Sequence, residues 1–156
     1  MGVEIERKFK VYHEKWQQLQ KNEGELYIQG YITTDAHKTI RVRVTSEKAY
    51  FTLKGISHGA VRKEFEYEIP QADAQELLEH FASAQLHKIR HKVVVSGKIW
   101  EVDVFKGDNE GLIIAEIELT DVGEDFEIPD WVSEEVTGQE KYYNSNLTLK
   151  PYKSWA

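Results

Sequence analysis

Residues 3–10 read Val-Glu-Ile-Glu-Arg-Lys-Phe-Lys, and this stretch decides the fold. Apolar and charged side chains alternate along it, with Val3, Ile5 and Phe9 on one side and charged side chains on the other. A period of two residues is typical of a β-strand whose two faces meet different surroundings. The stretch therefore predicts a strand with one apolar and one charged face.

The same alternation recurs along most of the chain. It predicts further strands at 39–45, 50–54, 61–69, 88–93, 100–104 and 115–119. Ser96-Gly97 predicts a hairpin turn between two of these strands. Helical features occur at 12–21, 70–84 and 131–147. Because strands greatly outnumber helices, the pattern predicts a mainly antiparallel sheet or barrel with helices on its outside.

Composition narrows the class of protein. At 156 residues the chain fits a single domain, residues 1–156, and it contains no cysteine, which excludes a cysteine nucleophile and favours a reducing compartment such as the cytoplasm. Its apolar runs are too short to cross a membrane. A net charge of -7 argues against broad nucleic-acid binding. We therefore expect a soluble cytoplasmic protein without a membrane or nucleic-acid partner.

The charged faces segregate by sign. Carboxylates occupy one set of predicted strands, at Glu4, Glu6, Glu64, Glu66, Asp103, Glu116 and Glu118. Cations occupy another set, at Arg41, Arg43, Lys54, Lys88 and Arg90. Like charges on one strand face repel, and a bound anion would relieve that repulsion if neighbouring strands add more cations. Carboxylates spaced two residues apart supply the hard oxygens that Mg²⁺ or Mn²⁺ requires, while Arg and Lys bind phosphate oxygens. This combination indicates a polyphosphate site.

A second interpretation stays open at this point. Antiparallel sheets commonly expose one face to water, and the same charges would then form surface ion pairs worth about 0–1 kcal/mol each. Other chemistries have less support, because the six histidines lack a metal-binding spacing. The phosphate-loop, dinucleotide-binding and nucleophile-elbow motifs do not occur either.

The order of these motifs resembles the CYTH, or triphosphate tunnel metalloenzyme, superfamily, and in particular its short bacterial members. Glu4-Ile5-Glu6-Arg7-Lys8 matches the ExExK opening of that superfamily. The resemblance continues through Gln29-Gly30-Tyr31, Arg41-Val42-Arg43, Thr52-Leu53-Lys54, Arg62-Lys63-Glu64-Phe65-Glu66, Lys88-Ile89-Arg90, Glu101-Val102-Asp103-Val104-Phe105, Glu116-Ile117-Glu118, Glu135-Val136-Thr137 and Lys141-Tyr142-Tyr143-Asn144. It implies an α+β, mainly β fold, in which a closed antiparallel barrel of about eight strands forms a charged tunnel with helices outside and a C-terminal plug helix.

The resemblance also implies roles for individual residues. The implied metal ligands, for Mg²⁺ or Mn²⁺, are Glu4, Glu6, Asp103, Glu116 and Glu118. The implied triphosphate cradle consists of Lys8, Arg41, Arg43, Lys54, Arg62, Lys88, Arg90 and Lys141. Glu64 and Glu66 match inward carboxylates that bind a second metal or orient water, and together with Glu4, Glu6 and Asp103 they form the implied catalytic set.

The expected activity is metal-dependent hydrolysis of a triphosphate, with inorganic triphosphate as the preferred substrate. Thiamine triphosphate and nucleoside triphosphates stay open as substrates. A class IV adenylyl cyclase is a further alternative, although no separate base-reading motif is present. A non-catalytic polyphosphate-binding module is the last alternative, and the intact acidic set argues against it. Several apolar strand faces with few helices to cover them predict a homodimer.

Overall fold

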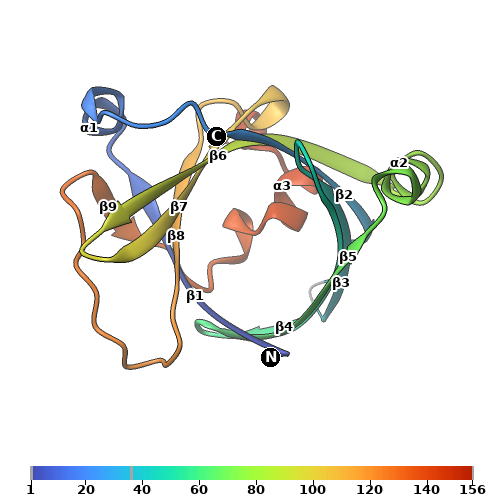
Figure 1. The fold of residues 1–156 in the computed structure, drawn as a ribbon, viewed down its shortest axis with the longest axis horizontal. Helices are drawn as coiled ribbons and strands as arrows, with labels where there is room; N and C mark the ends of the chain where they lie inside the picture. Colours follow the sequence, from blue (N-terminus) through green and yellow to red (C-terminus); the bar gives the residue numbers. More distant parts are fainter. Residues whose placement is uncertain (1, 36, 156) are drawn as a thin grey trace.

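The computed structural model describes residues 2–35 and 37–155, and strands surround its central opening (Figure 1). The strands are β1 (Val3–Val11), β2 (Glu25–Thr33), β3 (Lys38–Val44), β4 (Ala49–His58), β5 (Val61–Ile69), β6 (Ala84–Val95), β7 (Lys98–Phe105), β8 (Ile113–Glu118) and β9 (Val132–Glu135). The α-helices are α1 (His13–Gln18), α2 (Gln71–His80) and α3 (Asn144–Leu149). Short 3₁₀ segments occur at Gly107–Asn109, Glu140–Tyr142 and Tyr152–Ser154. None of the described helices has the length and apolarity needed to cross a membrane.

Eight strands close into an antiparallel barrel, as predicted. Their order is β5-β4-β3-β2-β6-β7-β8-β1, and pairing of β1 with β5 closes the ring. β1 makes this closure because both of its edges are used. Its first residues pair with β5, with Val3 opposite Lys63, while Glu6 lies opposite Glu118 of β8 on the other edge. Its last residue, Val11, pairs with Val132 of β9.

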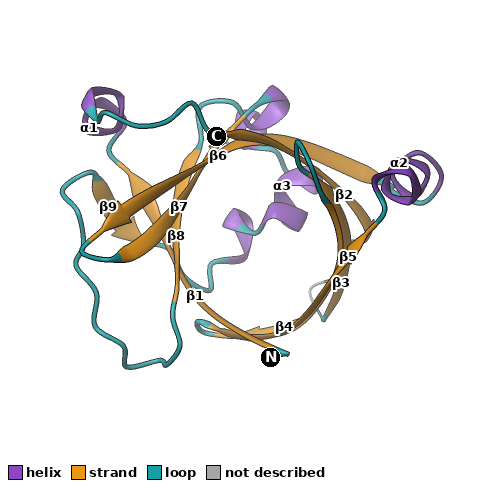
Figure 2. Ribbon diagram, viewed as in Figure 1, coloured by secondary structure: helices purple, strands orange, loops and turns teal. Residues whose placement is uncertain are grey.

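The strand alternation turns the charged faces inward and the apolar faces outward. Phe9 and Trp100, for example, are at most 2% exposed, yet they lie on the outer wall, where α1, β9 and the segment after β8 cover them. α2 covers a second outer cluster around Val42 and Leu78. Figure 2 shows both helices on the outside of the ring. The apolar cores of this fold therefore surround much of the barrel wall.

A third apolar cluster closes one end of the barrel. Phe105 and Ile114 contribute to it from the barrel strands, and Tyr142 and Leu147 contribute from the C-terminal segment. In Figure 1 this segment, coloured red, lies across the central opening. The chain end therefore acts as the predicted plug.

The helix predicted at 131–147 is wrong. Val132 to Glu135 form β9, and the backbone of Gly138 has a φ of 78°, which interrupts any helix. The plug consists instead of a 3₁₀ turn and the six-residue α3. The helices predicted at 12–21 and 70–84 are present but shorter. β2 was not predicted from alternation, because both of its faces carry apolar or aromatic side chains.

Candidate active site

A cavity of about 230 Å³ lies inside the barrel, and charged side chains dominate its wall. Seven carboxylates line it: Glu4, Glu6, Glu64, Glu66, Glu101, Glu116 and Glu118. Seven cationic side chains line it as well: Lys8, Arg41, Arg43, Lys54, Arg62, Lys88 and Arg90. Nearly all of the side chains predicted for the site therefore meet in one place, and the charges of the wall balance when all of these groups are ionised.

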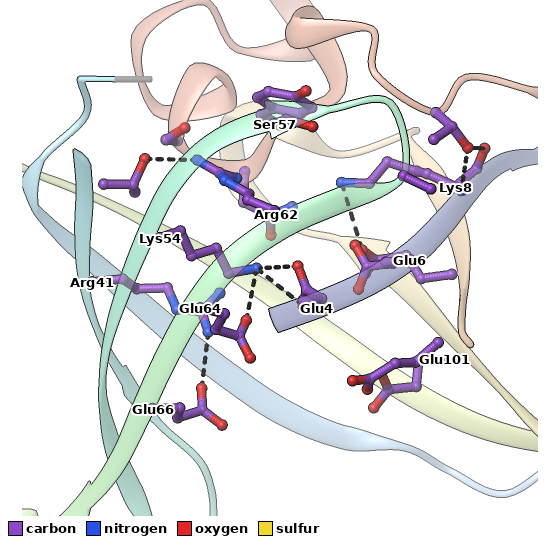
Figure 3. A pocket seen from close by; sticks show the side chains of 18 of the residues that line it. Glu4, Glu6, Lys8, Arg41, Lys54, Ser57, Arg62, Glu64, Glu66 and Glu101 are labelled. Atoms are coloured by element: carbon purple, nitrogen blue, oxygen red, sulfur yellow. Dashed lines mark hydrogen bonds and ion pairs between the residues drawn. The ribbon is translucent and has the colours of Figure 1, made fainter. Parts of the chain in front are cut away.

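Opposite charges pair across neighbouring strands on one side of the cavity. Lys54 of β4 lies opposite Glu64 of β5, and its Nζ is 3.2 Å from Glu4 Oε1 and 3.2 Å from Glu64 Oε2 (Figure 3). Arg41 and Arg43 approach Glu66 Oε2 at 3.2 and 3.4 Å. The strand register thus corrects part of the sequence argument, because carboxylates already offset much of the repulsion between cations.

A second ion cluster lies between β6, β7 and β8. Arg90 donates two hydrogen bonds to Asp103, at 2.8 and 2.9 Å, and it also pairs with Glu101 and Glu116 at 3.2 Å each. Lys88 Nζ lies 2.8 Å from Asp103 Oδ2. Burial, partly offset by the attraction of Asp103, lowers the pKa of Lys88 to about 7. These contacts keep Lys88 and Arg90 at the cavity wall.

Asp103 has a different position from the one predicted. It is 0% exposed and is absent from the cavity wall, and both of its carboxylate oxygens accept hydrogen bonds or ion pairs from Arg90 and Lys88. Oxygens occupied in this way have little capacity for a metal ion. The inward carboxylate of β7 that reaches the cavity is Glu101, two residues earlier on the same strand face. The alternation of side chains along this strand could have identified Glu101, because it places Glu101 and Asp103 on the same face.

The remaining predicted metal ligands lie on the adjacent strands β1 and β8. Burial, together with the charges of Glu116 and Glu4, raises the pKa of Glu6 well above its ordinary value. Burial opposes ionisation of Glu116 too, but Lys8, a hydrogen bond with Glu6 and Arg90 bring its pKa well below the ordinary value. Glu6 therefore gives up its proton less readily than an ordinary carboxyl group, and it lies beside Glu116, whose pKa is lowered. A divalent cation fits such a pair, because it can replace the proton between two hard oxygen donors.

The cluster is not a complete metal site by itself. No three of the described Asp, Glu and His side chains converge as a ready-made metal centre. The side chains of Arg41 and Arg43 nevertheless line the cavity, and their Nε atoms are buried without a hydrogen-bond partner in the described part of the chain. Buried donors normally have acceptors, so these two guanidinium groups have donor capacity that the described residues leave unused.

Two cations of the predicted set, Arg62 and Lys141, have opposite outcomes. Arg62 lines the cavity, and it is held by Gly55 O at 2.5 Å and Thr39 Oγ1 at 3.0 Å. Lys141 does not line the cavity. Its ammonium lies 4.6 Å from the ring centroid of Trp155 and 5.2 Å from that of Tyr142, so it packs on the aromatic C-terminal cluster.

The segment after β9, which includes the plug, supplies wall residues that were not assigned to the site from sequence. They are Thr137, Gly138, Tyr143, Asn144 and Ser145. Local patterns carry no signal for them, because they reach the cavity only when the chain end folds back across the barrel. The motif Lys141-Tyr142-Tyr143-Asn144 did draw attention to this region, although the wrong side chain was selected from it.

A closed barrel with paired acidic and basic walls inside and apolar clusters outside defines a class of tunnel proteins built to hold a small, highly charged ligand. The chain belongs to the CYTH domain family, whose model matches residues 2–151. This confirms the resemblance that the ordered motifs indicated.

Two relatives cover almost the whole chain. It is 50% identical over 156 residues to an inorganic triphosphatase of Acetivibrio thermocellus, with 99% of each chain covered. It is 32% identical over 155 residues to an inorganic triphosphatase of Nitrosomonas europaea, covering 94% of this chain and 97% of that one. Among solved structures, the inorganic triphosphatase NE1496 superposes with a TM-score of 0.63 at 29% identity, covering 93% of this chain and 97% of that one.

Proposed function

We propose that this protein hydrolyses a triphosphate in a metal-dependent reaction, and that inorganic triphosphate is its preferred substrate. The observation that carries the proposal is the single cavity in which β1 and β8 present carboxylates while β3, β4 and β6 present guanidinium and ammonium groups. The names of the two relatives support the same activity.

The charge balance of the cavity supports a requirement for Mg²⁺ or Mn²⁺. A triphosphate carries several negative charges, and the seven carboxylates in the wall would offset much of the attraction that the seven cations exert on it. Glu4, Glu6, Glu116 and Glu118 would hold the metal. A bound divalent ion would supply positive charge next to the phosphate oxygens and polarise them.

The side chains of the protein have separate tasks in this proposal. Arg41, Arg43 and Lys54 bind the phosphate oxygens and stabilise the charge that spreads over the transferred group. Glu64 and Glu66, which pair with these cations, lie where a carboxylate could orient the attacking water. Their pKa values shift in opposite directions. That of Glu64 is raised by burial, and that of Glu66 is lowered because Arg43, Thr52 and Arg41 outweigh burial.

A hollow next to the cavity keeps organic triphosphates as the second candidate substrates. It has a volume of about 300 Å³, contains Tyr27 and Tyr50, and shares Arg43 and Arg90 with the cavity. An organic group attached to the α-phosphate, as in thiamine triphosphate or a nucleoside triphosphate, would extend into this hollow. A class IV adenylyl cyclase would need the same space for adenine.

The test measures phosphate release from tripolyphosphate, thiamine triphosphate and ATP with Mg²⁺ or Mn²⁺ and with EDTA. We expect fastest turnover of tripolyphosphate and no turnover in EDTA. Replacing Glu6 and Glu118 together by Ala should remove the metal-dependent activity, whereas Glu127→Ala, at an exposed position, should retain it.

Each other outcome identifies an alternative. Full activity of the double variant would contradict the metal assignment, binding without turnover would indicate a polyphosphate-binding module, and cyclic AMP with pyrophosphate would indicate a cyclase.

We also propose that the protein is a cytoplasmic homodimer. The lack of cysteine supports a reducing compartment. An outer strip formed by Leu53, Phe65 and Tyr67 supports a partner subunit, because these side chains are 38%, 48% and 58% exposed. Leu53 lies directly opposite Phe65, so the three form one patch on β4 and β5.

A further inference from the structure

The plug contacts the cavity through side chains that have no assigned task. It crosses one end of the barrel, and its apolar side is anchored by Leu147, which is 0% exposed. Its polar side is turned to the cavity through Tyr143 and Asn144. The plug therefore has a greater role than closing an opening, because it places an aromatic ring and an amide among the cations of the cradle.

The side-chain oxygen of Asn144 receives two hydrogen bonds from different barrel strands. Lys88 Nζ donates to Oδ1 at 2.8 Å, and Gln29 Nε2 donates to the same oxygen at 3.3 Å. Gln29 is 0% exposed, and its Nε2 also lies 3.1 Å from the hydroxyl of Tyr31. Donors on β2 and β6 therefore determine which way the amide of Asn144 points.

Lys88 depends on this oxygen for its orientation. An ammonium group has three hydrogens to donate, and in the described residues two of them have acceptors, Asp103 Oδ2 and Asn144 Oδ1, both at 2.8 Å. Two fixed acceptors restrain the end of a long, flexible side chain and leave one donor for a phosphate oxygen. Without Asn144, only the Asp103 contact would hold the ammonium, on the side of Arg90 and away from the plug.

We propose that Asn144 is a positioning residue, which aims the ammonium of Lys88 at the triphosphate when the plug closes the barrel end. This inference rests on the proposed function, since it assigns Lys88 to substrate binding. The adjoining Tyr143 acts on the same cradle, because its ring lies 5.6 Å from Lys8 Nζ and 5.4 Å from the guanidinium carbon of Arg62. One turn of the plug thus organises cations from β1, β5 and β6.

The first experiment compares Asn144→Leu with Asn146→Leu. Asn146 lies on the same short helix, does not line the cavity, and donates to Glu140 O at 2.6 Å within the plug. A hydrogen bond to a charged group corresponds to about a 10- to 100-fold effect. We expect Asn144→Leu to lower kcat/KM for tripolyphosphate by about that factor, with a Tm close to that of Asn146→Leu, which should stay nearly as active as the wild type.

The second experiment is a double-mutant cycle with Lys88→Met. If Asn144 acts through Lys88, the variant that carries both substitutions loses no more activity than Lys88→Met alone. Should Lys88→Met fail to give a cooperative thermal transition, Gln29→Leu takes its place, because it releases the Asn144 amide without altering Lys88. Gln29→Leu should then reduce kcat/KM in the same direction as Asn144→Leu.

Several results would overturn the inference. These are full activity of Asn144→Leu, equal losses in Asn144→Leu and Asn146→Leu, additive losses in the cycle, or unchanged activity of Gln29→Leu. A wild-type protein that does not hydrolyse tripolyphosphate would instead contradict the proposed function, so the two failures are distinguishable.

Discussion

At the scale of single residues, buried charges dominate the energetics of the site. Lys88, Arg90 and Asp103 are 1%, 9% and 0% exposed, and each has at least one partner of opposite charge. Taking such groups out of water costs several kcal/mol per ion unless good geometry offsets it. Asp103 is the central member, because it compensates two cations at once. Its contribution is therefore to hold the cradle, in contrast to a carboxylate that faces the cavity.

The prediction at this scale compares Asp103→Asn with Glu118→Gln. Removing one partner from a buried ion pair typically costs about 3–5 kcal/mol, so Asp103→Asn should lower the free energy of unfolding by about that amount. Glu118→Gln removes an exposed cavity carboxylate, so it should lower activity and leave stability close to the wild type. Urea denaturation measures the free energy of unfolding of the two variants, with the exposed Asp108→Asn as control, and phosphate release measures their activity. Equal stability of Asp103→Asn and Asp108→Asn would contradict the structural role.

At the scale of elements, the outer face of the barrel determines how closely a helix can approach. Gly30 of β2 lies under α2 and the residues that follow it. A Cβ atom at this position would lie 2.4 Å from Leu78 Cδ2 and 2.9 Å from Ala82 Cβ. Leu78 Cδ2 is the end of a flexible side chain but Ala82 Cβ is not, so contacts this short force a shift in the packing of this segment against β2. The glycine in Gln29-Gly30-Tyr31 is therefore explained by close approach of backbone and helix.

Gly30→Ala should destabilise the protein by about 1–3 kcal/mol, the usual cost of overpacking. Gly55→Ala is the matched control, because its Cβ would lie 3.4 Å from Lys63 Cβ, an ordinary contact, and it should cost far less. Thermal unfolding of both variants measures the difference. If the two variants had the same Tm, close packing of α2 would not be the reason for glycine at position 30.

At the scale of the whole molecule, the barrel has charged side chains inside and apolar side chains outside, so its apolar exterior has to be shielded from water. α1, β9 and the segment after β8 cover one side, and α2 covers another. No described element of the chain covers the strip of Leu53, Phe65 and Tyr67 on β4 and β5. This distribution is the physical basis of the proposed homodimer, because exposed contiguous apolar side chains favour association.

Sedimentation at micromolar concentration should therefore show a dimer for the wild type and a monomer for Phe65→Lys. Val94→Lys is the control, since Val94 is 68% exposed near the β6–β7 hairpin, away from the strip, and should stay dimeric. A wild-type monomer under these conditions would overturn the proposal. A Phe65→Lys variant that stays dimeric would place the interface elsewhere.

Local alternation was enough to predict most strands and their charged faces, because a side chain's face depends only on its parity along a strand. The ordered motifs also predicted a closed barrel and nearly all of the charged residues that line the cavity. Local patterns failed where contacts between distant segments of the chain determine the surroundings of a side chain. Asp103 and Glu101 share one face, but only the register with β6 shows that Arg90 and Lys88 surround Asp103.

The sequence by itself therefore determined most of the strands, their charged faces and the family, since each is encoded in the order of residues along the chain. Only the tertiary structure decided that Lys141 packs on Trp155, that residues 131–147 form a strand and a short plug, and that Asn144 reaches Lys88. The physical reason is that closing the barrel brings positions 56 residues apart in the chain to hydrogen-bonding distance, and no local pattern records that contact.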